Sequence, residues 1–319
     1  QNAFDLGLAA NALSPRIDHR NPLSPTFFAR IFNRCKNLID DAALIADCAV
    51  VEHVWKRAHL DHLSAAQLLR TPAKWIFDYV YLSPAERIAQ GVGWRAHMGS
   101  AVHDAVQAIC IAGQDIDDAV GVALNEYDTC IAEDDQVLRQ RMRDAIPGCV
   151  DNGVEAVSGA GFVAGKSEQF AKLELPGIAV PVIGYIDFQQ TLANGALINC
   201  ELKTKGPRKT RLLKDGSQGW SKATLPKRPE WKNVCQASIY SAATGAETVI
   251  IYAAEHDSIT FTAENCDELK PSGLSAALEE MRQRALIRQN LLKISANPRV
   301  LASITDPDWQ HMYQWKIGE

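Results

Sequence analysis

The hydrophobic pattern of this chain changes period once, and that change limits the folds it can adopt. Apolar residues recur at helical spacing through most of residues 63–158 and then alternate with polar residues from about residue 169. The alternating part predicts strands over 169–175, 180–192 and 196–203. Asn194 and Gly195 join the last two strands, and this pair is typical of tight β-hairpins.

Helices and strands alternate again after this hairpin. We expect a basic loop from Thr204 to about Pro229, followed by a helix, one or two strands and a long final helix. The expected elements span 230–243, 248–254, 258–262 and 274–294. This order predicts an α/β (α+β) fold, with a mixed central β-sheet flanked by helices and a helical N-terminal half.

Three regions follow from this pattern. Residues 1–62 are expected to form a helical N-terminal extension, with apolar residues at helical spacing over 27–46. Residues 63–262 would form the core, helical over 63–160 and carrying the sheet and site over 161–262. Residues 263–319 would form a C-terminal helical segment.

Composition and charge restrict the class of protein. The chain has 319 residues with 47% hydrophobic residues, enough for a sizeable core. It lacks an apolar run of about 20 residues that could cross a bilayer. Its N-terminus lacks a basic segment followed by an apolar stretch, so we expect a cytoplasmic protein without membrane association. The net charge of -5 disfavours nucleic-acid binding mildly, although the distribution of charge matters more than its sum.

The eight cysteines are widely and irregularly spaced, without a C-x-x-C pair. That spacing argues against a zinc ribbon and against a secreted disulfide framework. We therefore expect reduced thiols that are mostly buried.

The predicted hairpin carries two carboxylates and a lysine. Side chains alternate along a strand, so Glu201 and Lys203 share one face while Leu202 points into the core. Asp187 lies on the partner strand, where it could face them. Burying unpaired charges costs several kcal/mol, and a hard divalent cation such as Mg²⁺ would compensate two carboxylates.

This arrangement resembles a known active site. Gly184 and Asp187, followed by Glu201 and Lys203, resemble the G-x-x-D and E-x-K elements of PD-(D/E)XK nucleases. Further matches resemble the RecB-like branch of that superfamily. They are Gly99 with His103 (G-x-x-x-H), Gln236 with Tyr240 (Q-x-x-x-Y), Glu168 before the first strand, and Leu63 to Leu68 with Pro72, Trp75 and Tyr79.

The resemblance covers about residues 63–254 and implies a restriction-endonuclease-like core. It implies an Mg²⁺- or Mn²⁺-dependent DNA exonuclease, related to CRISPR-associated and viral recombination exonucleases. The implied metal ligands are His103, Asp187, Glu201 and the Leu202 carbonyl. Asp187, Glu201 and Lys203 would be catalytic, with Lys203 activating water or stabilising charge on phosphorus. Gln236 and Tyr240 would position a DNA phosphate, and Glu168 would support the site or bind a second metal.

One departure from the family changes the expected cofactor. Iron–sulfur members have a cysteine before the proline at position 72 and a cysteine cluster near the C-terminus, whereas this chain has Thr71 and ends its cysteines at Cys266. We therefore expect no iron–sulfur cluster. The sequence also lacks a G-x-x-x-x-G-K-[ST] phosphate loop, so we expect no ATP-driven helicase activity.

The basic loop adds a candidate DNA track. Basic residues interleaved with aromatic ones suit a nucleic-acid backbone with stacked bases. The candidates are Lys205, Arg208, Lys209, Arg211, Lys222 and Trp220, with further lysines and arginines up to residue 232. A negative outer surface would then confine DNA to the cleft.

Other functions stay open at this point. The same fold could serve as a non-catalytic DNA-binding module, or as a structure-specific or restriction-type endonuclease. A metabolic enzyme with chance motifs would bind no divalent metal at Asp187 and Glu201. Within the exonuclease hypothesis, we expect linear DNA ends as substrate, in end resection for recombination or repair. A single-strand annealing protein is a possible partner, an oligomer is possible, and a viral protein would act in the host cytoplasm.

Overall fold

The computed structural model describes residues 54–131, 135–162, 165–192 and 194–305, all within the compact unit that spans residues 49–319. The expected helix over 27–46, Cys35, Cys48 and the tail tryptophans lie outside the described residues. Among the described residues, none of the helices is long and apolar enough to cross a membrane.

Short helices with side-chain caps begin the described chain. They are α4 (Ala65–Leu69), α5 (Pro72–Ile76), a π-helical turn (Phe77–Tyr81) and α6 (Pro84–Ala89). Ser64 and Thr71 each accept a hydrogen bond from the backbone N–H three residues later, which satisfies a donor that the helix itself leaves free. Three longer helices follow: α7 (Trp94–Cys110), α8 (Ile116–Thr129) and α9 (Gln136–Gly159).

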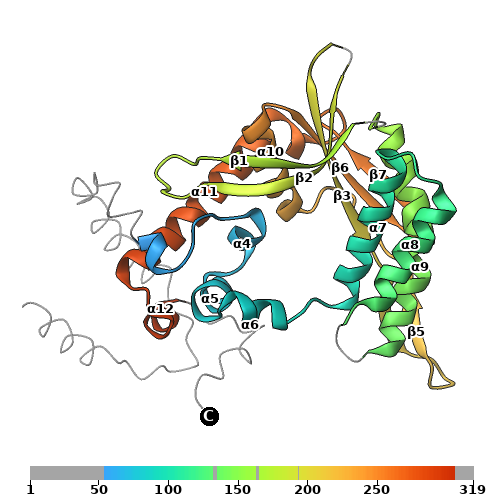
Figure 1. Cartoon of the computed structure of the whole chain (residues 1–319), viewed down its shortest axis with the longest axis horizontal. Helices are drawn as coiled ribbons and strands as arrows, with labels where there is room; N and C mark the ends of the chain where they lie inside the picture. The colour runs from blue at the N-terminus through green and yellow to red at the C-terminus, as the bar shows by residue number, and fades with distance from the viewer. Residues whose placement is uncertain (1–53, 132–134, 163–164, 193, 306–319) are drawn as a thin grey trace, which may run out of the picture. The chain divides into compact units, whose positions relative to one another are not determined.

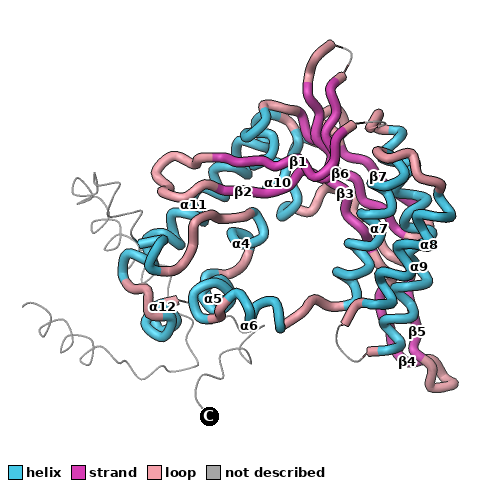
Figure 2. Tube along the Cα trace, in the orientation of Figure 1, coloured by secondary structure: helices cyan, strands magenta, loops and turns pink. Residues whose placement is uncertain are grey.

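The second half of the described chain contains the sheet. Its strands are β1 (Lys166–Leu173), β2 (Val182–Thr191), β3 (Leu197–Lys205), β6 (Glu247–Ala254) and β7 (Asp257–Phe261). The spatial order is β1-β2-β3-β6-β7, with β3 and β6 parallel and the other neighbours antiparallel. The helix α10 (Trp231–Thr244) connects β3 to β6, and α11 (Pro271–Ile294) and α12 (Pro298–Ile304) follow a 3-10 turn (Asp267–Leu269). The mixed central sheet flanked by helices is therefore confirmed (Figures 1 and 2).

Two hydrophobic cores lie on the two faces of this sheet. The first core joins α4, α5, α10, α11 and α12 to the sheet, and the second core joins α7, α8 and α9 to it. On β6, Ile250 and Tyr252 enter the first core, whereas Val249, Ile251 and Ala253 enter the second. Burial on both faces explains why this strand is a continuous apolar run. The C-terminal segment beyond residue 262 contributes to the first core through Ala277, Met281 and Leu292.

The sheet opens into a fork between β2 and β3. These strands pair from Phe188↔Cys200 to Thr191↔Leu197, and then β2 continues beside β1 while β3 continues beside β6. In Figure 1 the β1–β2 pair runs to the left and the β3–β6 pair runs downward. Just inside the fork, the Leu202 N–H donates to the Asp187 carboxylate at 2.8 Å. The fork therefore places polar side chains where strand pairing stops.

The expected basic loop is wrong in part, because it contains a second, two-stranded sheet. β4 (Arg208–Leu212) pairs with β5 (Gln218–Ser221) in antiparallel fashion. The turn between them holds Gly216 at φ +81, and Asp215 accepts a hydrogen bond from the Ser217 N–H. The Asp215-Gly216 pair was the available signal, but β4 is exposed at every position and lacks apolar alternation.

Candidate functional site

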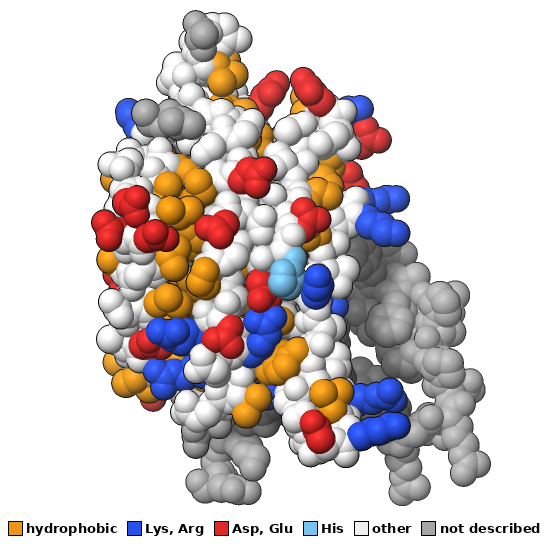
Figure 3. All heavy atoms as spheres, turned by 90° about the vertical axis from the view of Figure 1, so that its right-hand side faces the viewer, with side chains coloured by type: hydrophobic (Ala, Val, Ile, Leu, Met, Phe, Trp, Pro, Cys, Tyr) orange, Lys and Arg blue, Asp and Glu red, His pale blue; other side chains and the backbone are white. Residues whose placement is uncertain are grey.

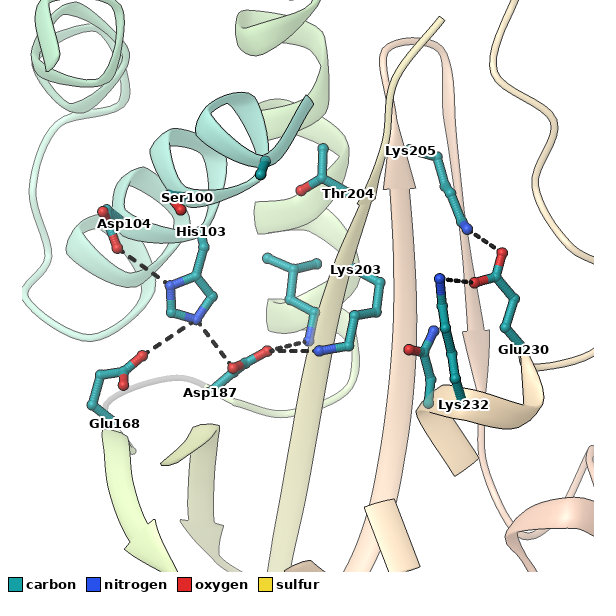
Figure 4. Close-up of a pocket in the computed structure, with 14 residues that line it drawn as sticks. Ser100, His103, Asp104, Glu168, Asp187, Lys203, Thr204, Lys205, Glu230 and Lys232 are labelled. Atoms are coloured by element: carbon teal, nitrogen blue, oxygen red, sulfur yellow. Dashed lines mark hydrogen bonds and ion pairs between the residues drawn. The ribbon is translucent and has the colours of Figure 1, made fainter. Parts of the chain in front are cut away.

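Helix α7 presents His103 to the fork. The residue lies mid-helix, with neighbouring Val102 fully buried in the second core. The ring Nδ1 lies 3.3 Å from Asp104 Oδ1, and the ring Nε2 lies 3.4 Å from Asp187 Oδ1 and 3.6 Å from Glu168 Oε1. Figure 4 shows the carboxylates of Glu168 and Asp187 directed at the same ring nitrogen of His103, Nε2.

Glu168 and Asp187 face each other across β1 and β2. The register pairs Ser167 with Phe188 and Gln169 with Ile186, so Glu168 and Asp187 occupy the intervening position. Glu168 has φ +49, which non-glycine residues rarely adopt. Regular alternation of β2 breaks at the same point. Ile186 packs in the first core, whereas Phe188, two residues later, packs in the second core on the other face of the sheet. This local irregularity coincides with the two carboxylates.

Glu201 and Lys203 lie side by side on β3. Glu201 is fully buried, and its Oε2 accepts a 2.7 Å hydrogen bond from Lys203 Nζ. Lys203 Nζ also lies 3.9 Å from Asp187 Oδ2. Cys200 and Leu202 enter the second core, so Glu201 and Lys203 occupy the opposite face, as strand alternation predicts.

The donor atoms fit a divalent cation. Ligand atoms of His103, Glu168 and Asp187 all lie within 4.8 Å of one another. Octahedral ligands at 2.0–2.1 Å are separated by about 3 Å when adjacent and about 4.2 Å when opposite. Two buried atoms, His103 Nε2 and Glu201 Oε1, have no hydrogen-bond partner, which leaves them available for a ligand. Glu168 thus belongs to the set of grouped donor atoms with His103 and Asp187. Glu201 lies outside that set and is hydrogen-bonded to Lys203.

Burial and charge shift the protonation of the site. Burial lowers the pKa of His103, but Asp104, Asp187 and Glu168 outweigh that effect and raise it to about 10. Burial and the Asp187 charge raise the pKa of Glu201. Burial opposes the ionisation of Asp187, yet Lys203 and His103 hold the pKa of Asp187 below its usual value. His103 and Lys203 thus place positive charge next to Asp187, whereas Glu201 is held toward its protonated form.

Helix α10 closes the other side of the fork. Gln236 Nε2 donates to the Tyr240 hydroxyl at 3.1 Å, and Tyr240 is buried. A Cβ on Gly184 would lie 2.6 Å from that hydroxyl, so only glycine lets β2 pass so close to Tyr240. Gln236, Tyr240 and Gly184 line a second cavity of about 430 Å³.

The basic candidates separate into two groups. Lys205 pairs with Glu230 at the mouth of the site, and Lys209 pairs with Asp135 at the start of α9. Arg208, Arg211 and Lys222 are exposed on or beside the β4–β5 hairpin, and Trp220 packs against the second core. Figure 3 shows the side of the molecule where α8 and α9 lie, and acidic and basic side chains are interspersed there.

Several polar residues that line the site are not part of the sequence motifs. The main cavity has a volume of about 670 Å³, and Leu202, His103, Asp187 and Lys203 are among its lining residues. It is also lined by Ser100, Asp104, Thr204, Glu230, Lys232 and Asn233. Adjacency to His103 could have indicated Asp104. Ser100 lies on the same helix as His103, three residues earlier. Thr204, Glu230, Lys232 and Asn233 come from β3 and the start of α10, and sequence spacing offers no signal that these meet.

Comparisons with known proteins give little beyond this geometry. None of the known family models matches the chain, and none of the curated proteins matches it. Among solved structures, one described as "Crystal structure of SSO0001" matches with 12% identity and a TM-score of 0.28. That match covers 66% of this chain and 84% of the other.

Proposed function

We propose that this chain is a metal-dependent deoxyribonuclease with a restriction-endonuclease-like core, of the RecB-like branch of the PD-(D/E)XK superfamily. The observation that supports it best is the fork, where His103, Glu168 and Asp187 converge beside the buried Glu201–Lys203 pair. A histidine and two carboxylates can hold a divalent cation, and a lysine beside them adds positive charge, which suits metal-assisted hydrolysis of a phosphodiester.

The acidic residues would hold Mg²⁺ or Mn²⁺. His103, Glu168 and Asp187 offer donor atoms that lie within reach of one ion, and Glu201 Oε1 is buried without a hydrogen-bond partner. When bound, the cation supplies Lewis-acid polarisation of the phosphate and lowers the pKa of a bound water. The Leu202 N–H fixes one oxygen of Asp187, which leaves the other directed toward His103.

Lys203 would supply the positive charge next to the reacting atoms. Its ammonium group already donates to Glu201 and lies near Asp187, so its position is fixed before substrate arrives. A preorganised cation stabilises the charge that develops on the phosphoryl oxygens. Gln236 would contribute an amide to a nearby phosphate, while Tyr240 holds that amide through its hydroxyl.

The activity is tested on linear and closed circular duplex DNA with Mg²⁺, Mn²⁺ or EDTA. Loss of linear DNA alone, abolished by Asp187→Asn, would support an exonuclease. Cutting of both forms would instead indicate an endonuclease. Binding without cleavage in every metal would contradict the proposal and favour a non-catalytic DNA-binding module.

Metal binding should also raise thermal stability. At a Mn²⁺ concentration of 100 times Kd, a site that exists only in the folded state gains about 2.7 kcal/mol, or roughly 4–5 °C in Tm for a domain of this size. His103→Ala should abolish this shift. His97→Ala, on the same helix but outside the site, should retain it. Equal shifts in the two variants would place the metal elsewhere.

The β4–β5 hairpin should contribute to DNA affinity through charge alone. Replacing Arg208, Arg211 and Lys222 together by alanine should lower the salt dependence of DNA binding by about one unit of slope for each phosphate that the variant no longer neutralises. Replacing Lys270, Lys293 and Arg282 makes the same charge change elsewhere and serves as the control. Binding that depends on salt equally in both variants would exclude the hairpin as a DNA track.

A further inference from the structure

Two exposed aromatic rings lie beside the acidic group. Phe170 on β1 and Tyr185 on β2 are direct cross-strand partners, with ring centroids 5.7 Å apart at an interplanar angle of 61°. Phe170 is 57% exposed and Tyr185 is 54% exposed. The pair therefore presents aromatic surface to solvent on the same two strands that carry Glu168 and Asp187.

Strand alternation puts these rings on the side of the sheet where α7 lies. Ala171 and Ile186 are buried in the first core, so Phe170 and Tyr185 point to the opposite face, on which the second core and α7 lie. The step from Asp187 to Tyr185 is two residues, about 6.8 Å along an antiparallel strand. The aromatic pair thus lies within about one nucleotide of the site.

As a cross-strand pair the two rings stabilise the strands by only about 0.2–1 kcal/mol. A strand pair is stabilised most when its side chains also pack on a core, and these two rings leave more than half of their surface in water. The partly exposed Ile183 and the exposed Lys172 form the next registered pair on the same face. This face of the two strands therefore carries the aromatic rings and, one pair further on, a cation.

We propose that Phe170 and Tyr185 form a stacking platform for an unpaired nucleobase next to the scissile phosphate. This inference rests on the proposed function and specifies its substrate. Aromatic side chains bind bases of any sequence through their faces, and a base inside a duplex is already stacked on both sides. The platform therefore favours single-stranded or frayed ends over blunt duplex ends.

The test removes the ring and the base separately. Phe170→Leu and Tyr185→Leu keep apolar bulk but remove the aromatic face, and Tyr185→Phe keeps it. Binding is measured by fluorescence anisotropy with short single strands in Ca²⁺, using strands with an intact base or an abasic site at each terminal position. Tyr81→Leu, an exposed aromatic outside the site, is the matched control.

The wild type should lose about tenfold in affinity when the stacked base is missing. Each leucine variant should lose about as much on intact DNA and nothing further on the abasic strand, because ring and base act as one interaction. Tyr185→Phe and Tyr81→Leu should match the wild type.

Additive losses, or leucine variants that bind like the wild type, would overturn the platform. These outcomes are separate from a failure of the proposed function. An enzyme that cleaves linear DNA but shows additive losses lacks the platform alone. A protein that cleaves no DNA contradicts the nuclease proposal, while the binding cycle still reports on the platform.

Discussion

Lys203→Met should reduce the rate of DNA cleavage by about 10²- to 10⁴-fold without loss of metal binding. The lysine ammonium is held by Glu201 and lies near Asp187, and under the proposed function it would lie beside the reacting phosphate. Removal of one preorganised electrostatic group costs about 10²–10³ in kcat, and loss of proton transfer costs up to about 10⁴. The measurement is the initial rate on linear DNA at saturating Mn²⁺.

Two further variants identify the cause of the lower cleavage rate. Glu201→Gln should reduce cleavage similarly, because Lys203 loses the carboxylate that positions it. Lys270→Met removes a lysine that pairs with Asp267 at the surface and should cleave like the wild type. The manganese-induced rise in Tm should persist in Lys203→Met. A Lys203→Met enzyme with nearly normal activity would exclude the lysine from the chemistry.

Arg288→Met should destabilise the fold by about 2–5 kcal/mol, since its loss leaves buried carbonyl groups without donors. Arg288 on α11 is 1% exposed and donates to the Leu68, Arg70 and Arg284 carbonyl oxygens. Its guanidinium also lies 6.0 Å from the Trp75 ring centroid. One side chain therefore ties the C-terminal helix to α4 and α5.

Equilibrium unfolding in urea measures this effect. Arg282→Met on the same helix removes an exposed ion pair with Glu279 and should change stability by well under 1 kcal/mol. Because Arg70 lines the second cavity beside Gln236, Arg288→Met should also weaken DNA binding at temperatures well below its Tm. Equal stability of the two variants would mean that water or a rearranged side chain satisfies those carbonyls.

Local pattern was enough to predict most elements of the sheet. Asn194 and Gly195 marked the hairpin, and the apolar run over 248–254 marked the strand β6, which the structure shows to be buried on both faces. Strand alternation also placed Glu201 and Lys203 on one face. The β4–β5 hairpin was missed because β4 is exposed at every position and lacks apolar alternation, so its turn residues were the remaining signal.

The site itself depends on contacts that sequence spacing does not specify. Glu168 reaches His103 through a left-handed backbone conformation, which nothing around that glutamate predicts. Glu201 is fully buried and accepts a hydrogen bond from Lys203, and it is not among the grouped donor atoms of His103, Glu168 and Asp187. The roles of Arg288 and Gln289 were also beyond sequence analysis. Gln289 accepts from Trp55, more than two hundred residues earlier, and such pairing is a property of the finished fold.

The fork has a consequence for how the protein matures. Its two arms come from separate stretches of chain, and α7, β1–β2 and β3 must all be docked before His103, Glu168, Asp187 and Lys203 meet. Contacts this distant in sequence form late, because the loop between them must close first. During synthesis, therefore, the nascent chain carries all its reactive side chains apart from one another. It gains a complete constellation only when both halves of the sheet have folded.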